Sequence, residues 1–148
     1  MTVPYFAYGS NLGQSALRER CPSARQLGVA RVEGFRLGFT RRSEKRRGGV
    51  ADLVPAPGSV VWGALFDVGD ELELLDRYEG VPTAYRRELW KVTTPEGSSV
   101  EAWVYVVAQK AAEMLPSREY WELLVEGARE AGLSGEYVAE IERIAHLP

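Results

Sequence analysis

Carboxylates, tyrosines and backbone N–H groups are the chemical groups that this sequence offers for catalysis. The chain of 148 residues contains one cysteine, Cys21, and one histidine, His146. A metal site built from several of these two side-chain types, such as a zinc or iron–sulfur site, is therefore excluded. A Ser–His or Cys–His nucleophile pair would require His146, two residues from the end, to fold back into a cleft. The sequence predicts chemistry without a metal.

Glu79 is the acidic residue whose position is unusual. Asp70 and Glu73 form an acidic variant of a capping box, which predicts a helix that ends at Gly80. Glu79 then lies in the last turn, where the helix dipole disfavours a carboxylate and is expected to raise its pKa. A proton shuttle near neutral pH needs such a carboxyl group. Alternatively, Glu79 pairs with a nearby arginine on the surface.

The stretch FAYGSNLG, residues 6–13, interrupts a strand-like run with glycine and small polar residues. Residues 3–8 are apolar on both alternating faces, which is typical of a strand covered on both sides. Ser10 and Asn11 are good N-caps for a following helix that Pro22 stops. Such a junction is either a plain turn or a place where N–H groups face a carboxylate or an oxyanion. Neither common phosphate-binding glycine pattern occurs, so a nucleotide site is not indicated.

The middle of the chain is rich in strand patterns. Alternating apolar residues predict one or two strands over residues 29–40. A hairpin is expected from residues 50–54 and 60–68 around a Pro-Ala-Pro-Gly turn. A second hairpin is expected from residues 88–93 and 100–107 around Thr-Pro-Glu-Gly-Ser.

Two helices are expected at the end of the chain. Pro116 and Ser117 begin the first, which runs to about Ala131 and is stopped by Gly132, and Ser134 caps the second. Strands in the middle and helices at the end indicate the α+β class, with an antiparallel or mixed sheet that can curl into a barrel.

Length, composition and charge limit the classes of protein to which this chain can belong. The size predicts a single domain over residues 1–148, and no run approaches the roughly 20 apolar residues of a membrane span. The N-terminus has no secretory signal pattern, which predicts a cytoplasmic protein. A net charge of −3 gives no general attraction to nucleic acid. The basic stretch RRSEKRR, residues 41–47, is expected to be a solvated loop, with DNA or RNA binding as the alternative.

Several segments together resemble the gamma-glutamylcyclotransferase family. They are YFAYGSNL (residues 5–12), GGVADLVPAPGSVVWGALFDV (48–68), LDRYEGVPTAYRR (75–87), AWVYVV (102–107) and PSREYWELLVEGARE (116–130). The resemblance covers nearly the whole chain. It implies a mixed β-barrel with helices packed around it and a cavity against the barrel. It also implies a reaction without a cofactor, in which the γ-glutamyl group of a small amide cyclises to 5-oxoproline and releases an amine or amino acid.

The same resemblance implies roles for particular residues. The family's catalytic glutamate falls on Glu79, which would act as general acid and base. The family's substrate loop falls on Tyr5, Phe6, Ala7, Tyr8, Gly9 and Ser10. Tyr120 matches a tyrosine that contacts the ligand, and Tyr105 is a candidate for the same cavity.

Two questions stay open at this level. The N–H groups of Gly9 and Ser10 would hold either the oxyanion of the reaction or the carboxylate of the substrate. A module of the same fold that only binds a small ligand or a partner is the alternative to an enzyme. The stretch at residues 41–47 departs from the family pattern, and if it borders the cavity it would alter substrate choice.

Overall fold

A computed structural model describes residues 3–148, which form a closed five-stranded β-barrel with four helices. The barrel order is β1-β3-β2-β4-β5. Neighbouring strands are antiparallel except β1 and β5, which are parallel. The predicted α+β class with a mixed barrel is therefore confirmed. The strands are β1 Tyr5–Ala7, β2 Arg25–Ser43, β3 Gly48–Asp67, β4 Tyr85–Thr93 and β5 Ser99–Val107.

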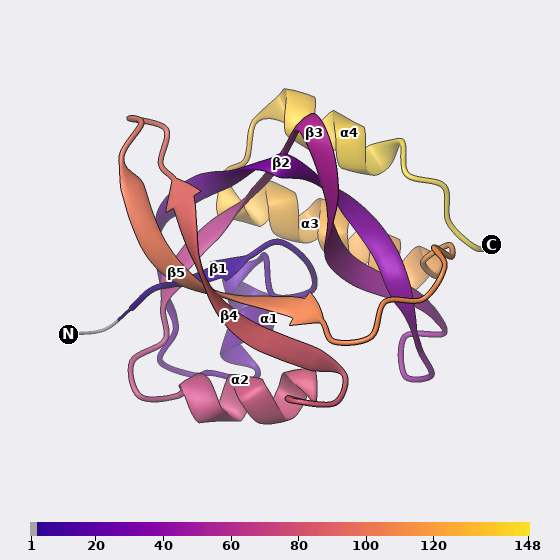
Figure 1. The fold of residues 1–148 in the computed structure, drawn as a ribbon, viewed down its shortest axis with the longest axis horizontal. Coiled ribbons are helices and arrows are strands. Elements are labelled where there is room, and N and C mark those ends of the chain that lie inside the picture. Colours follow the sequence, from indigo (N-terminus) through magenta and orange to yellow (C-terminus); the bar gives the residue numbers. More distant parts are fainter. Residues whose placement is uncertain (1–2) are drawn as a thin grey trace.

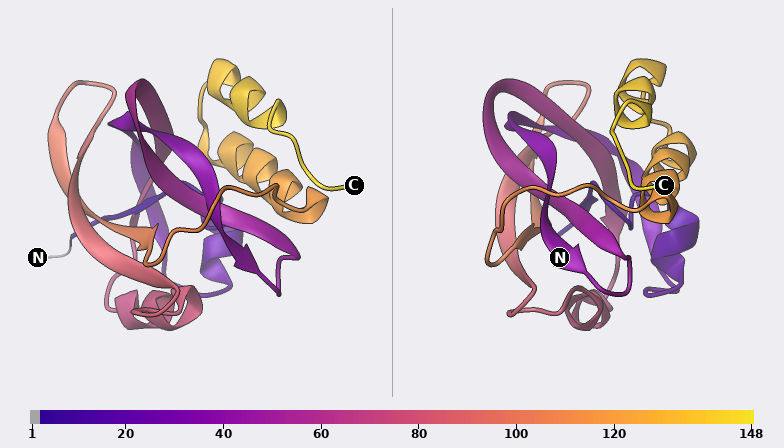
Figure 2. Two further views of the ribbon diagram at one scale, coloured as in Figure 1. Left: turned by 45° about the vertical axis from the view of Figure 1, so that its right-hand side comes forward. Right: turned by 90° about the vertical axis from the view of Figure 1, so that its right-hand side faces the viewer.

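Helices cover one side and one end of the barrel (Figures 1 and 2). Helices α1, α3 and α4 lie along one side, and α2 lies across the lower end in the view of Figure 1. Within the described part of the chain, no helix has the length and apolar character needed to cross a membrane. The helices are α1 Gln14–Arg18, α2 Leu72–Glu79, α3 Arg118–Ala131 and α4 Gly135–Glu142.

Strands β2 and β3 form one long antiparallel ladder, which corrects the hairpin expected around Pro-Ala-Pro-Gly. The register passes from Glu33 opposite Val60 to Phe35 opposite Pro55, so residues 56–59 form a bulge opposite Gly34. Proline is tolerated at a bulge because no ladder hydrogen bond is needed there. The turn that joins the two strands lies instead at residues 44–47, inside the basic stretch.

Two predicted helix starts are also wrong. Helix α1 begins at Gln14 with Gly13 as its N-cap, so neither Ser10 nor Asn11 caps it. Helix α2 begins one residue later than the capping box requires, with Glu71 as N-cap and no side-chain capping bond. Asn11 instead hydrogen-bonds to Glu79, and Asp70 stays exposed at the surface.

The predictions for the second half of the chain are confirmed. Strands β4 and β5 pair as a hairpin from Tyr85 opposite Val107 to Thr93 opposite Ser99. The Ser117 and Ser134 hydroxyls each accept a backbone N–H of the following helix at 3.2 Å. Gly132 ends α3 in a left-handed conformation with φ 82°.

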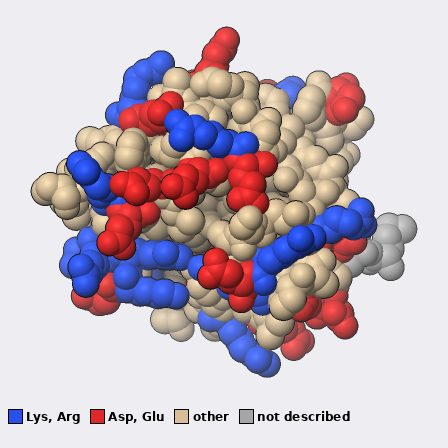
Figure 3. All heavy atoms as spheres, turned by 180° about the vertical axis from the view of Figure 1, so that it is seen from behind, with Lys and Arg blue, Asp and Glu red and all other residues tan. Residues whose placement is uncertain are grey.

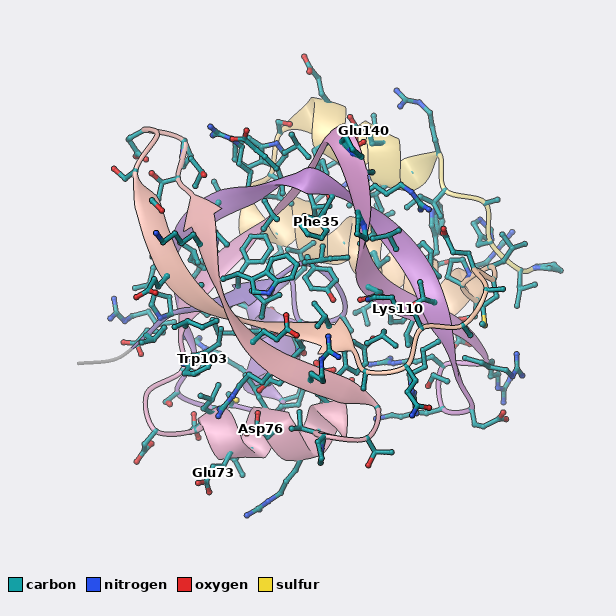
Figure 4. The ribbon with its side chains drawn as sticks, viewed as in Figure 1. Phe35, Glu73, Asp76, Trp103, Lys110 and Glu140 are labelled. Atoms are coloured by element: carbon teal, nitrogen blue, oxygen red, sulfur yellow. The ribbon has the colours of Figure 1, made fainter. Side chains whose placement is uncertain are left out.

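An ion pair between the buried Asp52 and the exposed Lys110 ties β3 to the segment after β5. Asp52 on β3 is fully buried and accepts hydrogen bonds from the Thr40 hydroxyl at 2.7 Å and the Val107 N–H at 3.0 Å. The Lys110 ammonium, on the segment after β5, pairs with the same carboxylate (Figure 4). The carboxylate therefore fixes β3 against β5 next to Ala51, a residue that reaches the functional site.

Candidate active site

A small cavity of about 30 Å³ lies where the β1–α1 turn meets the end of α2 and the barrel. That space holds about two water molecules. It adjoins an outer cavity of about 270 Å³, and the two share Ser10, Glu79, Tyr85 and Tyr120. The inner cavity is lined by Tyr5, Tyr8, Gly9, Ser10, Asn11, Ala51, Glu79, Tyr85, Tyr105 and Tyr120.

A larger groove of about 550 Å³ lies between α4 and the β2–β3 ladder. Its lining combines apolar side chains of α4 and the ladder with Glu136 and Glu140 on the helix and Arg36 on the strand, and Arg36 already pairs with Glu113. The smaller cavity is the better chemical candidate because it gathers a perturbed carboxyl group, unpaired N–H donors and aromatic walls in one place.

Glu79 supplies the carboxyl group of the inner cavity. Burial raises its pKa to about 7, and the nearby Arg20 and Arg46 only partly oppose that rise. Burial, rather than the helix dipole, is thus the main cause of the raised pKa. Among residues 3–148 no ion pair joins Glu79 to an arginine, so the alternative of a surface pair is wrong.

The end of α2 fixes where Glu79 points. Gly80 takes a left-handed conformation with φ 69°, which ends the helix directly after Glu79. The N–H groups of Gly80 and Val81 then donate back to the carbonyls of Arg77 and Asp76, at 3.2 and 3.0 Å. These bonds satisfy the last carbonyls of the helix.

Asn11 connects Glu79 to the opening turn, and its role in the cavity was not predicted from the sequence. Its Nδ2 donates to Glu79 Oε1 and to the Tyr5 hydroxyl, both at 3.2 Å. The residue is 2% exposed, and its Oδ1 is buried without a partner among the described residues. A buried amide oxygen without a donor is costly unless a ligand supplies one.

The predicted turn motif does form a turn, in which the Leu12 N–H donates to the Gly9 carbonyl at 3.0 Å. Gly9 and Ser10 line the cavity, and within residues 3–148 neither backbone N–H has an acceptor. A Cβ on Gly9 would lie 3.1 Å from Ala51 Cβ and 3.4 Å from the Tyr120 hydroxyl. A side chain at position 9 would therefore require the turn or β3 to shift by a few tenths of an ångström.

Tyrosines form the walls of the cavity, and hydrogen bonds hold most of them in place. Tyr8 donates to the Tyr105 carbonyl at 2.5 Å, and Tyr85 donates to the Ala51 carbonyl at 2.7 Å. Tyr120 accepts the Ala51 N–H at 3.0 Å. Burial raises the pKa of all these phenols, so they are neutral near pH 7 and act as walls and hydrogen-bonding groups.

The wall at Tyr105 is anchored to α2. The Tyr105 hydroxyl donates to Asp76 Oδ1 at 2.7 Å, and Arg87 pairs with the same carboxylate at 3.3 Å. Figure 4 shows Asp76 on the barrel side of α2, whereas Glu73 projects away from the barrel. The guanidinium of Arg87 also lies over the Trp103 ring, 4.5 Å from its centroid.

The structure brings most of the predicted site residues together, and no observation tests their roles. Phe6 and Ala7 do not line the cavity: both are fully buried in the core, with the Phe6 ring close to Gly63 on β3. The predicted residues found in the lining are Tyr5, Tyr8, Gly9, Ser10, Glu79, Tyr105 and Tyr120.

His146 lies outside both cavities, where its ring packs on Trp121 with 4.4 Å between centroids. No group of three or more His, Cys, Asp or Glu side chains in the described chain is arranged to hold a metal ion. The basic stretch is only partly the expected solvated loop, because Arg41, Lys45 and Arg46 line the outer cavity.

Comparison with known proteins agrees with this geometry. The AIG2-like family matches residues 60–141. Gamma-glutamylcyclotransferase of Mus musculus is 35% identical over 149 residues, covering 97% of this chain and 79% of the mouse protein. The Homo sapiens protein of that name is 35% identical over 146 residues, covering 95% of this chain and 77% of its own length. A solved structure described as gamma-glutamyl cyclotransferase has a TM-score of 0.94 at 33% identity, covering 99% of this chain and 90% of the other. The chain therefore belongs to the AIG2-like gamma-glutamylcyclotransferase family.

Proposed function

We propose that this protein is a gamma-glutamylcyclotransferase that uses Glu79 as general acid and base and needs no cofactor. Its substrate is a small γ-glutamyl amide or peptide, and its products are 5-oxoproline and a free amine or amino acid. The relatives named gamma-glutamylcyclotransferase, which match this chain over nearly its whole length, support the reaction. A cytoplasmic location and the absence of a nucleic-acid partner stay predictions from the sequence.

The reaction is an internal transfer of the acyl group. The α-nitrogen of the γ-glutamyl group attacks its own side-chain carbonyl carbon, a new C–N bond closes the five-membered ring, and the original amide C–N bond breaks. The attacking nitrogen gives up two protons, and the leaving nitrogen takes up two to depart as an ammonium ion. Because nucleophile and electrophile belong to one molecule, the substrate supplies most of the proximity itself. The protein must move protons and stabilise the oxyanion.

Glu79 is suited to move those protons, and its placement carries the proposal. Its carboxyl group lies in the cavity with a pKa of about 7, so near neutral pH it can accept a proton and give it back. A general acid–base residue matched to the working pH contributes about 10²- to 10⁴-fold in rate. The Asn11 amide donates to Oε1, which leaves the other oxygen of the carboxyl group for the substrate.

The β1–α1 turn is suited to hold the substrate oxygens. The free N–H groups of Gly9 and Ser10 are the donors that an oxyanion or a carboxylate requires. A donor to the oxyanion is worth roughly 3 kcal/mol of barrier. The unpartnered Oδ1 of Asn11 accepts a hydrogen from the substrate ammonium, which places the attacking nitrogen beside Glu79. Tyr5 and Tyr8 close the cavity around the glutamyl chain.

The test is a panel of γ-glutamyl compounds with different leaving groups, scored for 5-oxoproline and for the released amine. Wild type is expected to release both products from at least one compound. Glu79→Gln, which keeps nearly the same shape, is expected to lose about 10²-fold or more in kcat. Glu73→Gln, on the outward side of the same helix, is the matched control and should keep wild-type rates. If wild type released 5-oxoproline no faster than Glu79→Gln from every compound, the proposed enzyme activity would be refuted. The alternative, a module of the same fold that only binds a ligand or partner, would then stand.

A further inference from the structure

The outer cavity continues the inner cavity beside Glu79. It has about 270 Å³ and meets the inner cavity at Ser10, Glu79, Tyr85 and Tyr120. If the glutamyl end lies against the turn and Glu79, as the proposed function requires, the group on the far side of the scissile amide extends into this space. The chemistry of its lining should therefore determine which leaving groups are accepted.

That lining carries an excess of positive charge. Arg41 at the end of β2 and Lys45 and Arg46 in the β2–β3 turn border the cavity, and Glu79 at the junction is its one acidic lining residue. In the part of the chain that the structure describes, none of these three cations lies within 4 Å of a carboxylate. Arg41 and Arg46 are also half-buried, which makes an unpaired charge costly. Figure 3 shows Lys and Arg side chains gathered at the lower left of the rear face, on the side where this turn lies.

Tyr78 fixes one of these cations in position. Its hydroxyl accepts hydrogen bonds from Arg46 Nη2 and Arg20 Nη2, both at 2.6 Å. The Arg46 guanidinium also lies 5.7 Å from the centre of the Tyr120 ring, and the Lys45 ammonium lies 5.1 Å from that of Tyr78. A guanidinium that is held by a tyrosine hydroxyl and an aromatic ring keeps its remaining donors for an anion. The cluster is thus arranged at the cavity before any ligand arrives.

We propose that this cluster selects a leaving group with two anionic groups, that is, an acidic amino acid such as glutamate or aspartate. One α-carboxylate is satisfied by one guanidinium in a bidentate pair. The cluster has two further cations, and a second carboxylate on the leaving group is the partner that they lack. A cationic amine, by contrast, would be repelled from the same space. The assignment rests on the proposed function and narrows its substrate class.

Matched substrates test the assignment without altering the protein. The kcat/KM of γ-glutamyl-aspartate is compared with that of γ-glutamyl-asparagine, and γ-glutamyl-glutamate with γ-glutamyl-glutamine, because each pair differs by one charge at nearly constant size. The acidic member is expected to be favoured by about tenfold or more, which corresponds to about 1.4 kcal/mol. The preference should shrink at high salt because the cluster is partly exposed. Equal values within both pairs would overturn the assignment.

Variants then locate the preference. Arg41→Gln and Lys45→Met are expected to lower kcat/KM more for the acidic member of each pair than for its neutral partner, so that the preference for the acidic member shrinks. Arg42→Gln is the matched control, because Arg42 belongs to the same basic stretch, pairs with Glu44 at 3.4 Å and does not line the cavity. An equal loss on acidic and neutral substrates would overturn the assignment while the proposed reaction stood. Absence of 5-oxoproline from every compound would instead overturn the reaction itself, and the assignment with it.

Discussion

Replacing Glu79 by Gln is expected to stabilise the protein above neutral pH while it lowers kcat by about 10²-fold or more. The carboxyl group has an ordinary pKa of 4.5, and burial raises it to about 7 in the folded chain. The folded protein therefore favours the neutral form. Gln keeps the shape and removes the ionisation, so the variant reports what the ionised group costs the fold.

The size and sign of the effect follow from those two pKa values. They differ by about 2.5, which corresponds to about 3 kcal/mol at about 1.4 kcal/mol per pH unit. Below pH 4.5 the group is neutral in both the folded and the unfolded chain, and its contribution to stability is fully present. As pH rises through about 7 that contribution is lost, because the folded chain must then hold an ionised carboxylate in a poorly solvated cavity.

Urea unfolding of wild type and Glu79→Gln at several pH values between 4.5 and 8.5 measures this directly. The variant is expected to match wild type near pH 4.5 and to exceed its free energy of unfolding by about 3 kcal/mol at pH 8. In wild type, kcat/KM should also rise with pH and level off above an apparent pKa near 7. Glu73→Gln, on the outward side of α2, serves as the control for an exposed Glu-to-Gln substitution on the same helix. A difference between wild type and Glu79→Gln that does not change with pH would refute the reasoning.

Three further substitutions test the surroundings of the site. Gly9→Ala places a Cβ 3.1 Å from Ala51 Cβ and should lower kcat/KM by about 10- to 100-fold with little loss of stability; wild-type initial rates would contradict this. Tyr120→Phe leaves the buried Ala51 N–H without an acceptor and should cost about 1–3 kcal/mol in urea unfolding, and an unchanged midpoint would show that another group replaces the hydroxyl. Lys110→Met leaves the buried Asp52 carboxylate without its cation and should lower the free energy of unfolding by about 1–3 kcal/mol in urea at low salt; a midpoint equal to that of wild type would contradict this.

The second half of the fold could be predicted from the sequence because its signals are local. Ser117 and Ser134 each bond an N–H three residues ahead, and Gly132 ends a helix through its own backbone conformation. Such signals lie within one helical turn. They are therefore visible in the sequence without knowledge of the tertiary structure.

The β2–β3 ladder could not be predicted correctly from the same kind of signal. Proline and glycine within residues 55–58 produce the same local pattern whether the chain reverses or only bulges. Here residues on both sides of the bulge stay paired with β2, from Val60 opposite Glu33 to Pro55 opposite Phe35. Whether the chain reverses or bulges is decided by which residues of β2 and β3 pair. That pairing cannot be read from residues 55–58 alone.

Some residues of the candidate site could be predicted from the sequence, and others could not. Glu79 stood out because a carboxylate is unusual at the end of a helix, and the tyrosines of the cavity belong to segments that resemble a known family. The contact between Asn11 and Glu79 joins residues 68 positions apart, and local propensity suggested only a helix cap for Asn11. Phe6 entered the predicted site with its neighbours in the motif, although in the structure its ring packs into the core.

Ala51 and Asp52 explain how one short piece of β3 can position most of the cavity. The N–H and C=O of Ala51 bind the hydroxyls of Tyr120 and Tyr85, and its small side chain lets Gly9 approach. Asp52 fixes the same segment to β5. Helix α3, the strand pair β4–β5 and the opening turn are thus all held against one dipeptide, Ala51–Asp52. Because each connection is short and buried, a small shift of this segment would move several walls relative to Glu79 at once, so the position of Ala51 and Asp52 on β3 is a requirement of the site as well as of the barrel.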